Sequence, residues 1–465
     1  MTYCRTPLRL FNTLSRTRQE IRPIAPPKVR LYACGPTVYA RAHIGNFRTF
    51  LFVDLLRRAL TLFGFTPEEV MNYTDVDDKT IAAAQAASLP LREFTARYIE
   101  LFEEDEKTLH ILPPDHRPKA TDHIGLMIAL IEQLLRKGHA YVAEDGSVYF
   151  RIATFPDYGN LVHLDRQRLL PGARIAQDES VKEAVGDFAL WKASKPEDGE
   201  VGWASPWGKG RPGWHIECSA MSMHYLGEEF DLHCGGTDLI FPHHENEIAQ
   251  SRCATGGAFA HAWLHCGHVL VDGEKMSKSL GNVYSVADVL ARGYTGRHLR
   301  FLLLTAAHYR QTLNFTWDGL AAAKAAVGRI DDWLARWRQL PTDRFSGAAA
   351  EGEAFLASFC ASLGDDLNIS DAVGHFFEFL RATNRAIDLG APLPNLPTLW
   401  RTVDSVLGLG EPAETPPPQV QGLVARRAAA RSRRDWKESD SLREAIEKEG
   451  WMVRDTAGGQ ELRRR

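Results

Sequence analysis

The pattern of apolar and polar positions predicts a parallel α/β unit near the start of the chain. The apolar run at 29–34, VRLYAC, predicts a buried strand, which a Gly-Pro turn follows. From Phe47 to Phe65 the apolar residues recur at helical spacing, and EVMNYTDVDD at 69–78 predicts a second strand. A strand, a helix and a second strand form a βαβ unit, which places a ligand site at the carboxyl ends of the parallel strands.

Later segments predict more helices, two more strands and one linker. Helices are expected at 80–110, 121–139, 287–340 and 354–390, and strands at 146–155 and 229–241. The segment 194–214 contains three tryptophans among its glycines and prolines, which favours an ordered loop over a disordered linker. The proline-rich stretch at 408–419 predicts an extended linker, and a basic helical segment follows it.

The composition is typical of a soluble globular protein. The chain has 465 residues, of which 44% are hydrophobic and 25% are charged, which suits about three domains with large cores. No apolar run approaches the roughly 18 residues of a membrane helix, so we expect no membrane partner. The N-terminal segment is rich in arginine, as in a transit peptide, but it lacks the apolar core of a secretory signal. We therefore expect a cytoplasmic protein.

Charge and cysteine usage add two expectations. The net charge is −4, but residues 423–465 carry twelve Lys/Arg against eight Asp/Glu. A basic end on an acidic body indicates either an anionic partner or a solvated helical face. Seven cysteines in a chain of this length do not indicate a disulfide scaffold, and we expect free thiols or metal ligands.

The stretch FPHHENEIA at 241–249 contains two histidines and two glutamates within five positions. It fails as a protease-type H-E-x-x-H motif because Ile248 stands where the second histidine is required. Residues four apart share a helix face, so His243 and Glu247 would lie together. These residues alone leave two interpretations open, a metal site and a polar surface.

Two short motifs suggest binding of a polyphosphate. HIGN at 43–46 opens a helix after a strand and a turn, and helix N-termini favour phosphate. His43 and Asn46 would add donors there. KMSKS at 275–279 lies between two glycines, and its two lysines would stabilise charge on a departing pyrophosphate. Each motif alone is also compatible with an ordinary surface feature.

Together and in this order, the two motifs resemble the HIGH and KMSKS motifs of class I aminoacyl-tRNA synthetases. A closer resemblance, to the cysteinyl-tRNA synthetase family, lies in YACGPTVYARAHIGN, NYTDVDDK, GRPGWHIECSAMSMHYLG, FPHHENEIAQS and DGEKMSKSLGN. It extends from about Leu8 to the C-terminus. HIGN departs from the general HIGH pattern at Asn46 but agrees with this branch.

The resemblance implies an α/β fold. A Rossmann-type parallel-sheet catalytic domain, split by an insertion, would precede a connecting fold, a helical bundle and a small C-terminal anticodon-binding domain. The implied boundaries are 1–114 and 206–260 for the two halves of the catalytic domain, 115–205 for the connective insertion, 261–318 for the connecting fold with the KMSKS loop, 319–407 for the helical bundle, and 408–465 for the linker and anticodon-binding domain.

The resemblance also implies a zinc site made of Cys34, Cys218, His243 and Glu247. Thiolate, imidazole and carboxylate all suit Zn²⁺. The zinc would recognise the thiol of substrate cysteine, since the hydroxyl of serine is a poorer ligand. His244 and Glu245 would lie on other helix faces and make hydrogen bonds. Cys234 remains open as a small residue near the nucleotide, a spare thiol or a ligand.

The other site residues follow from matching positions in the family. The implied cysteine pocket contains Thr74, Trp214 and His233. The ATP site would comprise His43, Asn46, Gly236, Asp238 and Lys278, and the catalytic set would comprise His43, Asn46, Lys275 and Lys278. Magnesium would accompany ATP, although no carboxylate cluster marks its site. The implied anticodon contacts are Arg431, Trp436, Asp440 and Asp455. Trp436 alone would also suit the core of a small helical domain.

The implied activity is a two-step ligation. ATP and L-cysteine would give cysteinyl-adenylate and pyrophosphate, and the acyl group would then pass to the terminal ribose of tRNA(Cys). We expect a monomer. Two alternatives remain: a ligase that joins cysteine to a small amino sugar, and a non-catalytic zinc- or RNA-binding paralogue. The basic segment after Leu423 argues against the first, and the intact HIGN and KMSKS motifs argue against the second.

Overall fold

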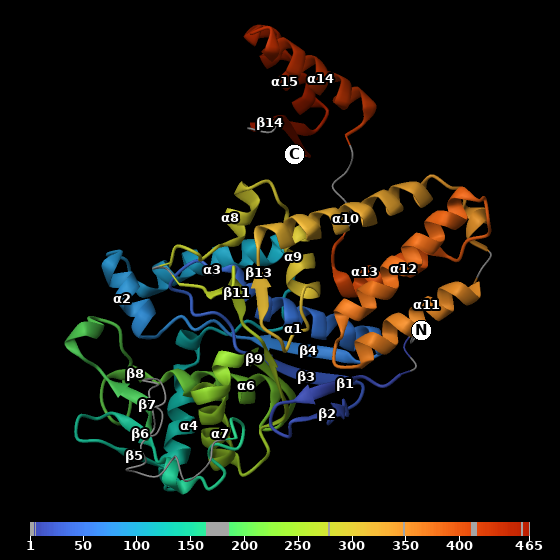
Figure 1. The fold of residues 1–465 in the computed structure, drawn as a ribbon. Coiled ribbons are helices and arrows are strands. Elements are labelled where there is room, and N and C mark those ends of the chain that lie inside the picture. Colours follow the sequence, from blue (N-terminus) through green and yellow to red (C-terminus); the bar gives the residue numbers. More distant parts are fainter. Residues whose placement is uncertain are drawn as a thin grey trace. The chain divides into compact units, whose positions relative to one another are not determined.

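The computed structural model describes residue 4 and residues 6–163, 186–277, 280–346, 349–410, 416–456 and 459–464. The chain divides into two compact units, Met1–Leu409 and Gly410–Arg465 (Figure 1). The boundary falls within the predicted linker at 408–419, of which residues 411–415 lie outside the described residues. Lys278 also lies outside them.

A four-stranded parallel sheet forms the centre of the first unit (Figure 1). Its strand order is β10 (Ala260–Cys266), β9 (Phe230–Gly236), β3 (Lys28–Ala33) and β4 (Thr66–Met71). Helix α1 (Ile44–Leu62) connects β3 to the parallel strand β4. This arrangement confirms the βαβ unit predicted from the sequence.

Two hydrophobic cores lie against the two faces of this sheet. Along β3, Leu31 and Ala33 pack in one core with α1, whereas Tyr32 packs in the other. That second core also contains residues of α4 (Ile124–Arg136), α6 (Trp214–Leu226) and α7 (Glu245–Thr255). Successive residues of a strand point to opposite faces, so a strand buried on both faces is apolar at nearly every position.

Two predicted elements have different bounds in the structure. The strand expected at 69–78 is β4, which ends at Met71. Downstream of it, Asp77 accepts a hydrogen bond from the Thr80 amide and so begins α2 (Asp78–Ala86). The region 80–110 is helical as expected, but it is divided into α2 and α3 (Leu91–Thr108). Pro90 lies between them and disfavours helical backbone at the preceding residue.

An antiparallel sheet is inserted between β4 and α6. Its strands, in order, are β5 (Ala140–Val142), β6 (Val148–Phe150), β7 (Phe188–Ala193) and β8 (Gly210–Pro212). The strand expected at 146–155 is therefore short, and the 3-10 turn η2 (Ile152–Thr154) follows it. The ordered loop expected at 194–214 is confirmed, since Trp203 and Gly210 exchange backbone hydrogen bonds of 2.7 and 3.0 Å.

The rest of the first unit is mainly helical, as the sequence indicates. It contains β11 (Val269–Val271), β12 (Glu274–Lys275), α8 (Val286–Ala291), α9 (Gly296–Thr305), β13 (Leu313–Phe315), α10 (Trp317–Arg338), α11 (Ala349–Gly364), α12 (Ile369–Asp388) and α13 (Leu396–Leu407). Strand β13 contradicts the continuous helical region expected at 287–340, and it pairs in parallel with β11. The helix expected at 354–390 is interrupted where Asp366 and Leu367 have positive φ values of 61° and 54°.

A hairpin and a disulfide lie near the N-terminus. Strands β1 (Arg9–Asn12) and β2 (Thr17–Glu20) pair in antiparallel fashion, and β1 lies beside β10. Cys4 forms a disulfide with Cys360 of α11. The expectation of free thiols or metal ligands is therefore wrong for this pair, whereas the other five cysteines are unpaired thiols in the described structure.

The second unit contains two helices and a hairpin. Helices α14 (Pro418–Ser432) and α15 (Trp436–Lys448) form the basic helical segment predicted from the sequence. Strands β14 (Trp451–Thr456) and β15 (Gly459–Arg464) were not expected. Val420, Ile446 and Trp451 form its small core. Across the described parts of both units, every helix is too short or too polar to cross a lipid bilayer.

Candidate metal centre and nucleotide site

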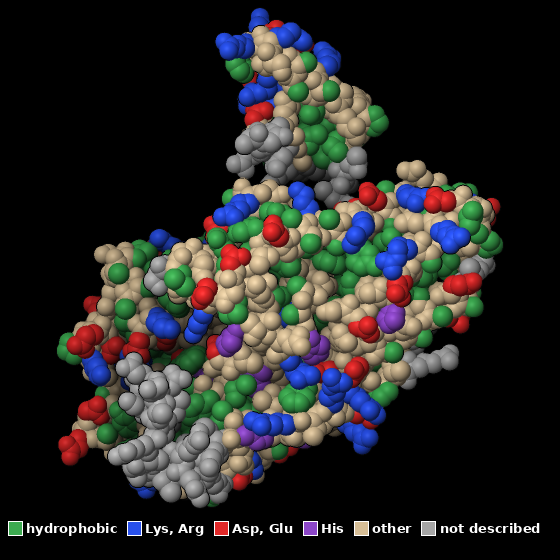
Figure 2. All heavy atoms as spheres, in the orientation of Figure 1, with side chains coloured by type: hydrophobic (Ala, Val, Ile, Leu, Met, Phe, Trp, Pro, Cys, Tyr) green, Lys and Arg blue, Asp and Glu red, His purple; other side chains and the backbone are tan. Residues whose placement is uncertain are grey.

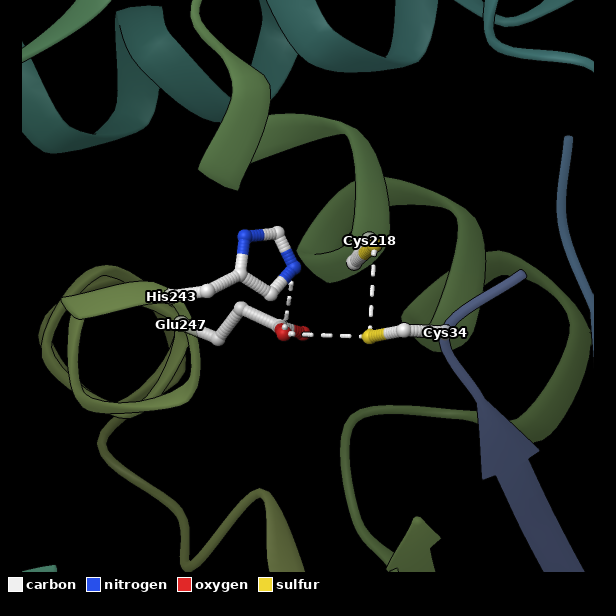
Figure 3. A group of neighbouring side chains, drawn as sticks. All are labelled: Cys34, Cys218, His243 and Glu247. Atoms are coloured by element: carbon white, nitrogen blue, oxygen red, sulfur yellow. Dashed lines mark hydrogen bonds and ion pairs between the residues drawn. The ribbon is translucent and has the colours of Figure 1, made fainter. Parts of the chain in front are cut away.

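Four buried side chains converge beyond the carboxyl end of β3 (Figure 3). Cys34 directly follows β3, Cys218 lies in α6, His243 lies in the short π-helical segment η6 (Ile240–His244), and Glu247 lies in α7. Their ligand atoms all lie within 4.8 Å of one another. The structure thus brings together the four residues that the sequence resemblance grouped.

The distances within this cluster suit one small metal ion. The Cys34 and Cys218 sulfurs are 3.8 Å apart, and the Cys34 sulfur lies 3.7 Å from Glu247 Oε1. His243 Nε2 lies 3.1 Å from the same Glu247 oxygen, as expected for residues four apart on a helix. This buried nitrogen makes no hydrogen bond to any described residue. A buried nitrogen that lies near two sulfurs and a carboxylate without a well-oriented hydrogen bond fits a metal ligand.

The ionisable groups of the cluster change one another's pKa values. The hydrogen bond from Cys34 lowers the pKa of Cys218 to about 6, whereas burial raises the pKa of Cys34. Burial opposes protonation of His243, but the charges of Cys218 and Glu247 raise its pKa to about 10. Burial also opposes ionisation of Glu247, but His233 and His243 lower its pKa to about 2. Anionic ligands around one cationic ring provide a site in which a metal cation can replace the proton.

Two further histidines contact the cluster. His233 Nε2 lies 3.0 Å from Glu247 Oε2, and its ring stacks on Trp263 at a centroid distance of 4.3 Å. His244 Nε2 lies 3.4 Å from the Cys34 sulfur. Cys34, His233, His244 and Glu247 form a second group that could hold a metal ion. The hydrogen-bonding role expected for His244 agrees with this contact.

Glu245 and Cys234 point away from the cluster. The Glu245 carboxylate accepts hydrogen bonds of 2.8, 3.0 and 3.2 Å from the amides of Gly159, Leu161 and Val162. It therefore anchors the inserted segment to α7. Cys234 is fully buried in the hydrophobic core that contains α1, and it belongs to neither metal-binding group found among the described residues.

Sequence reasoning missed two polar residues beside the cluster. Asn72 Oδ1 accepts hydrogen bonds from the Tyr32 hydroxyl at 3.1 Å and from the Gly35 amide at 3.0 Å. His215 Nδ1 lies 3.0 Å from His243 Nδ1, which directs the opposite nitrogen of His243 toward the cluster. Their positions depend on contacts between separate elements, and no local pattern marks them.

The residues expected to line a cysteine pocket lie around the same cluster. The Trp214 ring lies 4.2 Å from the His243 ring, and this indole is 39% exposed at the start of α6. Thr74 is buried beside Asn72, whose amide donates to its hydroxyl at 3.3 Å. His233, in contrast, lies behind Glu247 as a fully buried residue.

The HIGN motif forms the N-terminal cap of α1. His43 Nδ1 accepts from the Asn46 amide at 3.2 Å, and Asn46 Oδ1 accepts from the His43 amide at 3.0 Å. This reciprocal arrangement is a capping box. It leaves His43 Nε2 and the Asn46 side-chain amide as donors at a helix N-terminus. Burial lowers the pKa of His43, although the charge of Asp238 partly opposes that effect.

The loop that carries KMSKS lies against the start of α1. A side chain on Gly45 would collide with Met276, because the Met276 Cε lies 2.3 Å from the Cβ position. Asn282 closes this loop: its side chain accepts from the Ser277 amide at 2.8 Å and donates to the Lys275 carbonyl at 3.2 Å. The two distant motifs are thus adjacent in the fold.

The GGTD segment ends the neighbouring strand on the same edge of the sheet. Gly236 is the last residue of β9, and the exposed Asp238 lies in the short turn η5 (Thr237–Leu239). Since β3 and β9 are parallel, this turn and the HIGN helix lie at the same edge of the sheet.

Most of the residues that are predicted to contact RNA lie close together in the second unit. The Arg431 guanidinium lies 5.4 Å from the Trp436 ring centre, and Trp436 is 56% exposed. Asp455 pairs with Arg431 at 3.2 Å and with the buried Arg427 at 2.8 Å. Arg427, which the sequence did not single out, thus joins α14 to β14. Asp440 is exposed on α15, and lysine and arginine side chains gather over both helices (Figure 2).

Comparison with known proteins agrees with this arrangement. Residues 20–325 match the family of class I tRNA synthetase (C) catalytic domains, residues 358–410 match the DALR domain, and residues 415–463 match the cysteinyl-tRNA ligase anticodon binding domain. A methionyl-tRNA synthetase from Mycobacterium tuberculosis, solved with methionyl-adenylate, is similar in fold, with a TM-score of 0.60 at 16% identity. That similarity covers 82% of this chain and 88% of the solved one. The fold and its paired motifs are those of a class I aminoacyl-tRNA synthetase.

Sequence similarity specifies the family within this class. The cysteine–tRNA ligases of Protochlamydia amoebophila and Chlamydia muridarum are each 46% identical to this chain. The similarity covers 98% of this chain in both cases, and 98% and 99% of the two relatives. The chain belongs to the cysteine–tRNA ligase family.

Proposed function

We propose that this chain uses ATP to activate L-cysteine as cysteinyl-adenylate, releases pyrophosphate, and transfers the cysteinyl group to the terminal adenosine of tRNA(Cys). The observation that carries this proposal is the buried Cys34–Cys218–His243–Glu247 cluster beside the HIGN helix, in a member of the cysteine–tRNA ligase family. The cysteine carboxylate attacks the α-phosphate of ATP, so the protein acts mainly by positioning groups and stabilising charge.

Zinc is the metal that best suits the cluster. Zinc bonds of about 2.3 Å to sulfur and about 2.1 Å to nitrogen or oxygen require tetrahedral ligands about 3.4–3.8 Å apart. The distances of 3.8, 3.7 and 3.1 Å between the ligand atoms are close to those values. A zinc ion held there would supply a Lewis acid that favours the thiolate form of substrate cysteine.

This chemistry accounts for selection of cysteine against serine. A pocket of fixed shape separates such similar side chains by only about 1–3 kcal/mol. A selectivity of about 10⁴ requires roughly 5.5 kcal/mol. Thiolate is a much better zinc ligand than a hydroxyl, so binding through sulfur supplies the difference. Trp214, which lies over His243, and Thr74 then enclose the substrate side chain, and His233 holds Glu247 in place.

The capping box of α1 supplies donors for the triphosphate. His43 accepts through Nδ1, so its proton resides on Nε2, which faces away from the helix as a donor. Asn46 likewise offers its side-chain amide, and Lys275 and Lys278 neutralise the departing pyrophosphate, with Mg²⁺ bound to ATP. Asp238 accepts from a ribose hydroxyl, and Gly236 allows close approach of the nucleotide.

The second unit binds the anticodon of tRNA(Cys). Trp436 stacks on an unpaired base, and Arg431 contacts phosphate or a base edge. Asp440 accepts from a base amino group. Asp455 holds Arg431 in position, since its carboxylate is already paired with two arginines. We also propose a monomeric cytoplasmic enzyme with the six segments assigned from the sequence.

The match of residues 415–463 to an anticodon binding domain supports tRNA over a small amino sugar as acceptor. The experiment is to supply the protein with ATP and cysteine, and with either tRNA(Cys) or an amino-sugar acceptor. We expect cysteine-dependent pyrophosphate exchange and charging of tRNA alone. Transfer to the amino sugar without tRNA charging would overturn the proposal, and absence of pyrophosphate exchange would favour a non-catalytic protein.

A further inference from the structure

A hydrogen-bond chain leads from the metal cluster to the N-terminal hairpin. His244 Nε2 lies 3.4 Å from the Cys34 sulfur, and His244 Nδ1 lies 2.7 Å from His265 Nε2. His265 Nδ1 lies 2.7 Å from the hydroxyl oxygen of Thr13. The chain therefore joins the end of β3, the segment η6, β10 and the hairpin through three consecutive contacts.

Each member of this chain is held in place by its surroundings. Thr13 is fixed to β10 because its amide donates to the Trp263 carbonyl at 2.8 Å. His265 is 4% exposed and His244 is fully buried. The His244 ring also packs on Gly235, where a Cβ atom would lie 2.7 Å from His244 Cε1. Both rings are enclosed by the fold, and hydrogen bonds between these atoms can run in either direction.

The direction of the chain follows from the state of Cys34. A cysteine bound to a metal is a thiolate and has no proton to donate. A neutral imidazole has one N–H, which must be on His244 Nε2 if the ring is to donate to that sulfur. His244 Nδ1 then accepts from His265 Nε2, and His265 Nδ1 accepts from the Thr13 hydroxyl. The opposite direction would point the lone pair of His244 Nε2 at the thiolate.

We propose that Thr13 and His265 are positioning residues of the metal centre, which fix His244 as a hydrogen-bond donor to the Cys34 thiolate. This inference rests on the proposed metal site and adds residues outside the four ligands. Groups that orient ligands of a metal typically change its affinity by about 10–100-fold when they are removed. Thr13 thus connects an otherwise unassigned hairpin to recognition of the substrate thiol.

The experiment compares Thr13→Val, which removes only the hydroxyl donor, with Thr13→Ser, which retains it. Thr17→Val is the matched control, since Thr17 lies in the same hairpin and its hydroxyl lies 2.9 Å from the hydroxyl of the exposed Ser15. Zinc affinity is measured on the full chain by competition with a chromophoric chelator. The sulfur-to-metal charge-transfer band is recorded after loading with Co²⁺.

We expect Thr13→Val to weaken zinc binding by about 10-fold or more and to shift the Co²⁺ band. Thr13→Ser and Thr17→Val should both match the wild type. A folded Thr13→Val protein with wild-type zinc affinity and an unchanged band would overturn the inference. A loss of folding stability without either change would show a purely structural role and would also overturn it.

A second measurement does not require a variant. Histidine ¹⁵N NMR of the zinc-loaded wild type should show the proton of both His244 and His265 on Nε2. A proton on Nδ1 of either ring would overturn the inference even if Thr13→Val fails to fold. If the wild-type protein binds no zinc, the proposed metal centre itself is wrong. If the wild type binds zinc and Thr13→Val binds it equally well, only the positioning role of Thr13 and His265 is wrong.

Discussion

Replacing Cys218 with serine removes one anionic ligand from the proposed metal centre. Because the hydrogen bond from Cys34 lowers the pKa of Cys218 to about 6, its thiol is mostly ionised at pH 7.5, whereas a serine hydroxyl stays protonated. Loss of groups that only orient a ligand costs up to about 100-fold in metal affinity. Loss of a ligand should therefore cost at least about 100-fold, or about 2.7 kcal/mol.

The assay measures zinc content after dialysis, zinc affinity by chelator competition, and binding of cysteine and ATP separately. Cys218→Ser should lose zinc and bind cysteine more weakly. ATP binding should be unchanged, because the HIGN donors lie on α1. Cys253→Ser is the matched control, since burial raises the pKa of Cys253 to about 11 and its thiol lies outside the cluster. Wild-type zinc affinity in Cys218→Ser would refute the ligand assignment.

Three further outcomes are expected. Burial raises the pKa of Glu69 to about 8 from an ordinary value near 4.5, so the folded state keeps a proton that the unfolded state releases as pH rises. Between pH 5 and pH 7.5, the free energy of unfolding of the wild type, measured by chemical denaturation, should therefore fall by about 3 kcal/mol relative to that of Glu69→Gln. If the difference in unfolding free energy between the two proteins does not change with pH, this expectation is contradicted. Trp436→Ala should raise the KM for tRNA by about 5–150-fold, as expected for the loss of about 1–3 kcal/mol of base stacking. Trp436→Phe should change this KM little, and Trp436→Ala should leave the rate of pyrophosphate exchange nearly unchanged. An unchanged KM for tRNA in Trp436→Ala would argue against stacking. Cys4 and Cys360 should resist alkylation in denatured protein until a reductant is added, and immediate alkylation of both would disprove their disulfide.

Features set by local spacing could be predicted from the sequence. The strand at 29–34 and the helix after HIGN follow from runs of neighbouring side chains, and both elements are present as β3 and α1. The pairing of His243 with Glu247 follows from helix geometry, and the two side chains lie 3.1 Å apart. Local physics was sufficient in these cases because each interaction spans one turn or one strand.

Features that depend on the closed fold could not be predicted in this way. Cys34 and Cys218 are 184 positions apart, and only the resemblance to a family grouped them. The disulfide joins residues 356 positions apart, for which no spacing rule exists. Strand β13 has three residues, too few for a period to be visible. The hairpin β14–β15 did carry a signal, because the three residues AGG separate WMVRDT from QELRRR.

The central claim is that a metal bound by Cys34, Cys218, His243 and Glu247 recognises the substrate thiol during charging of tRNA(Cys). The most direct measurement is cysteine-dependent charging of tRNA(Cys) by protein stripped with a zinc chelator, before and after zinc is restored. The account predicts that charging is lost on stripping and returns with zinc, while ATP binding persists throughout. Full charging by demonstrably metal-free protein would contradict it.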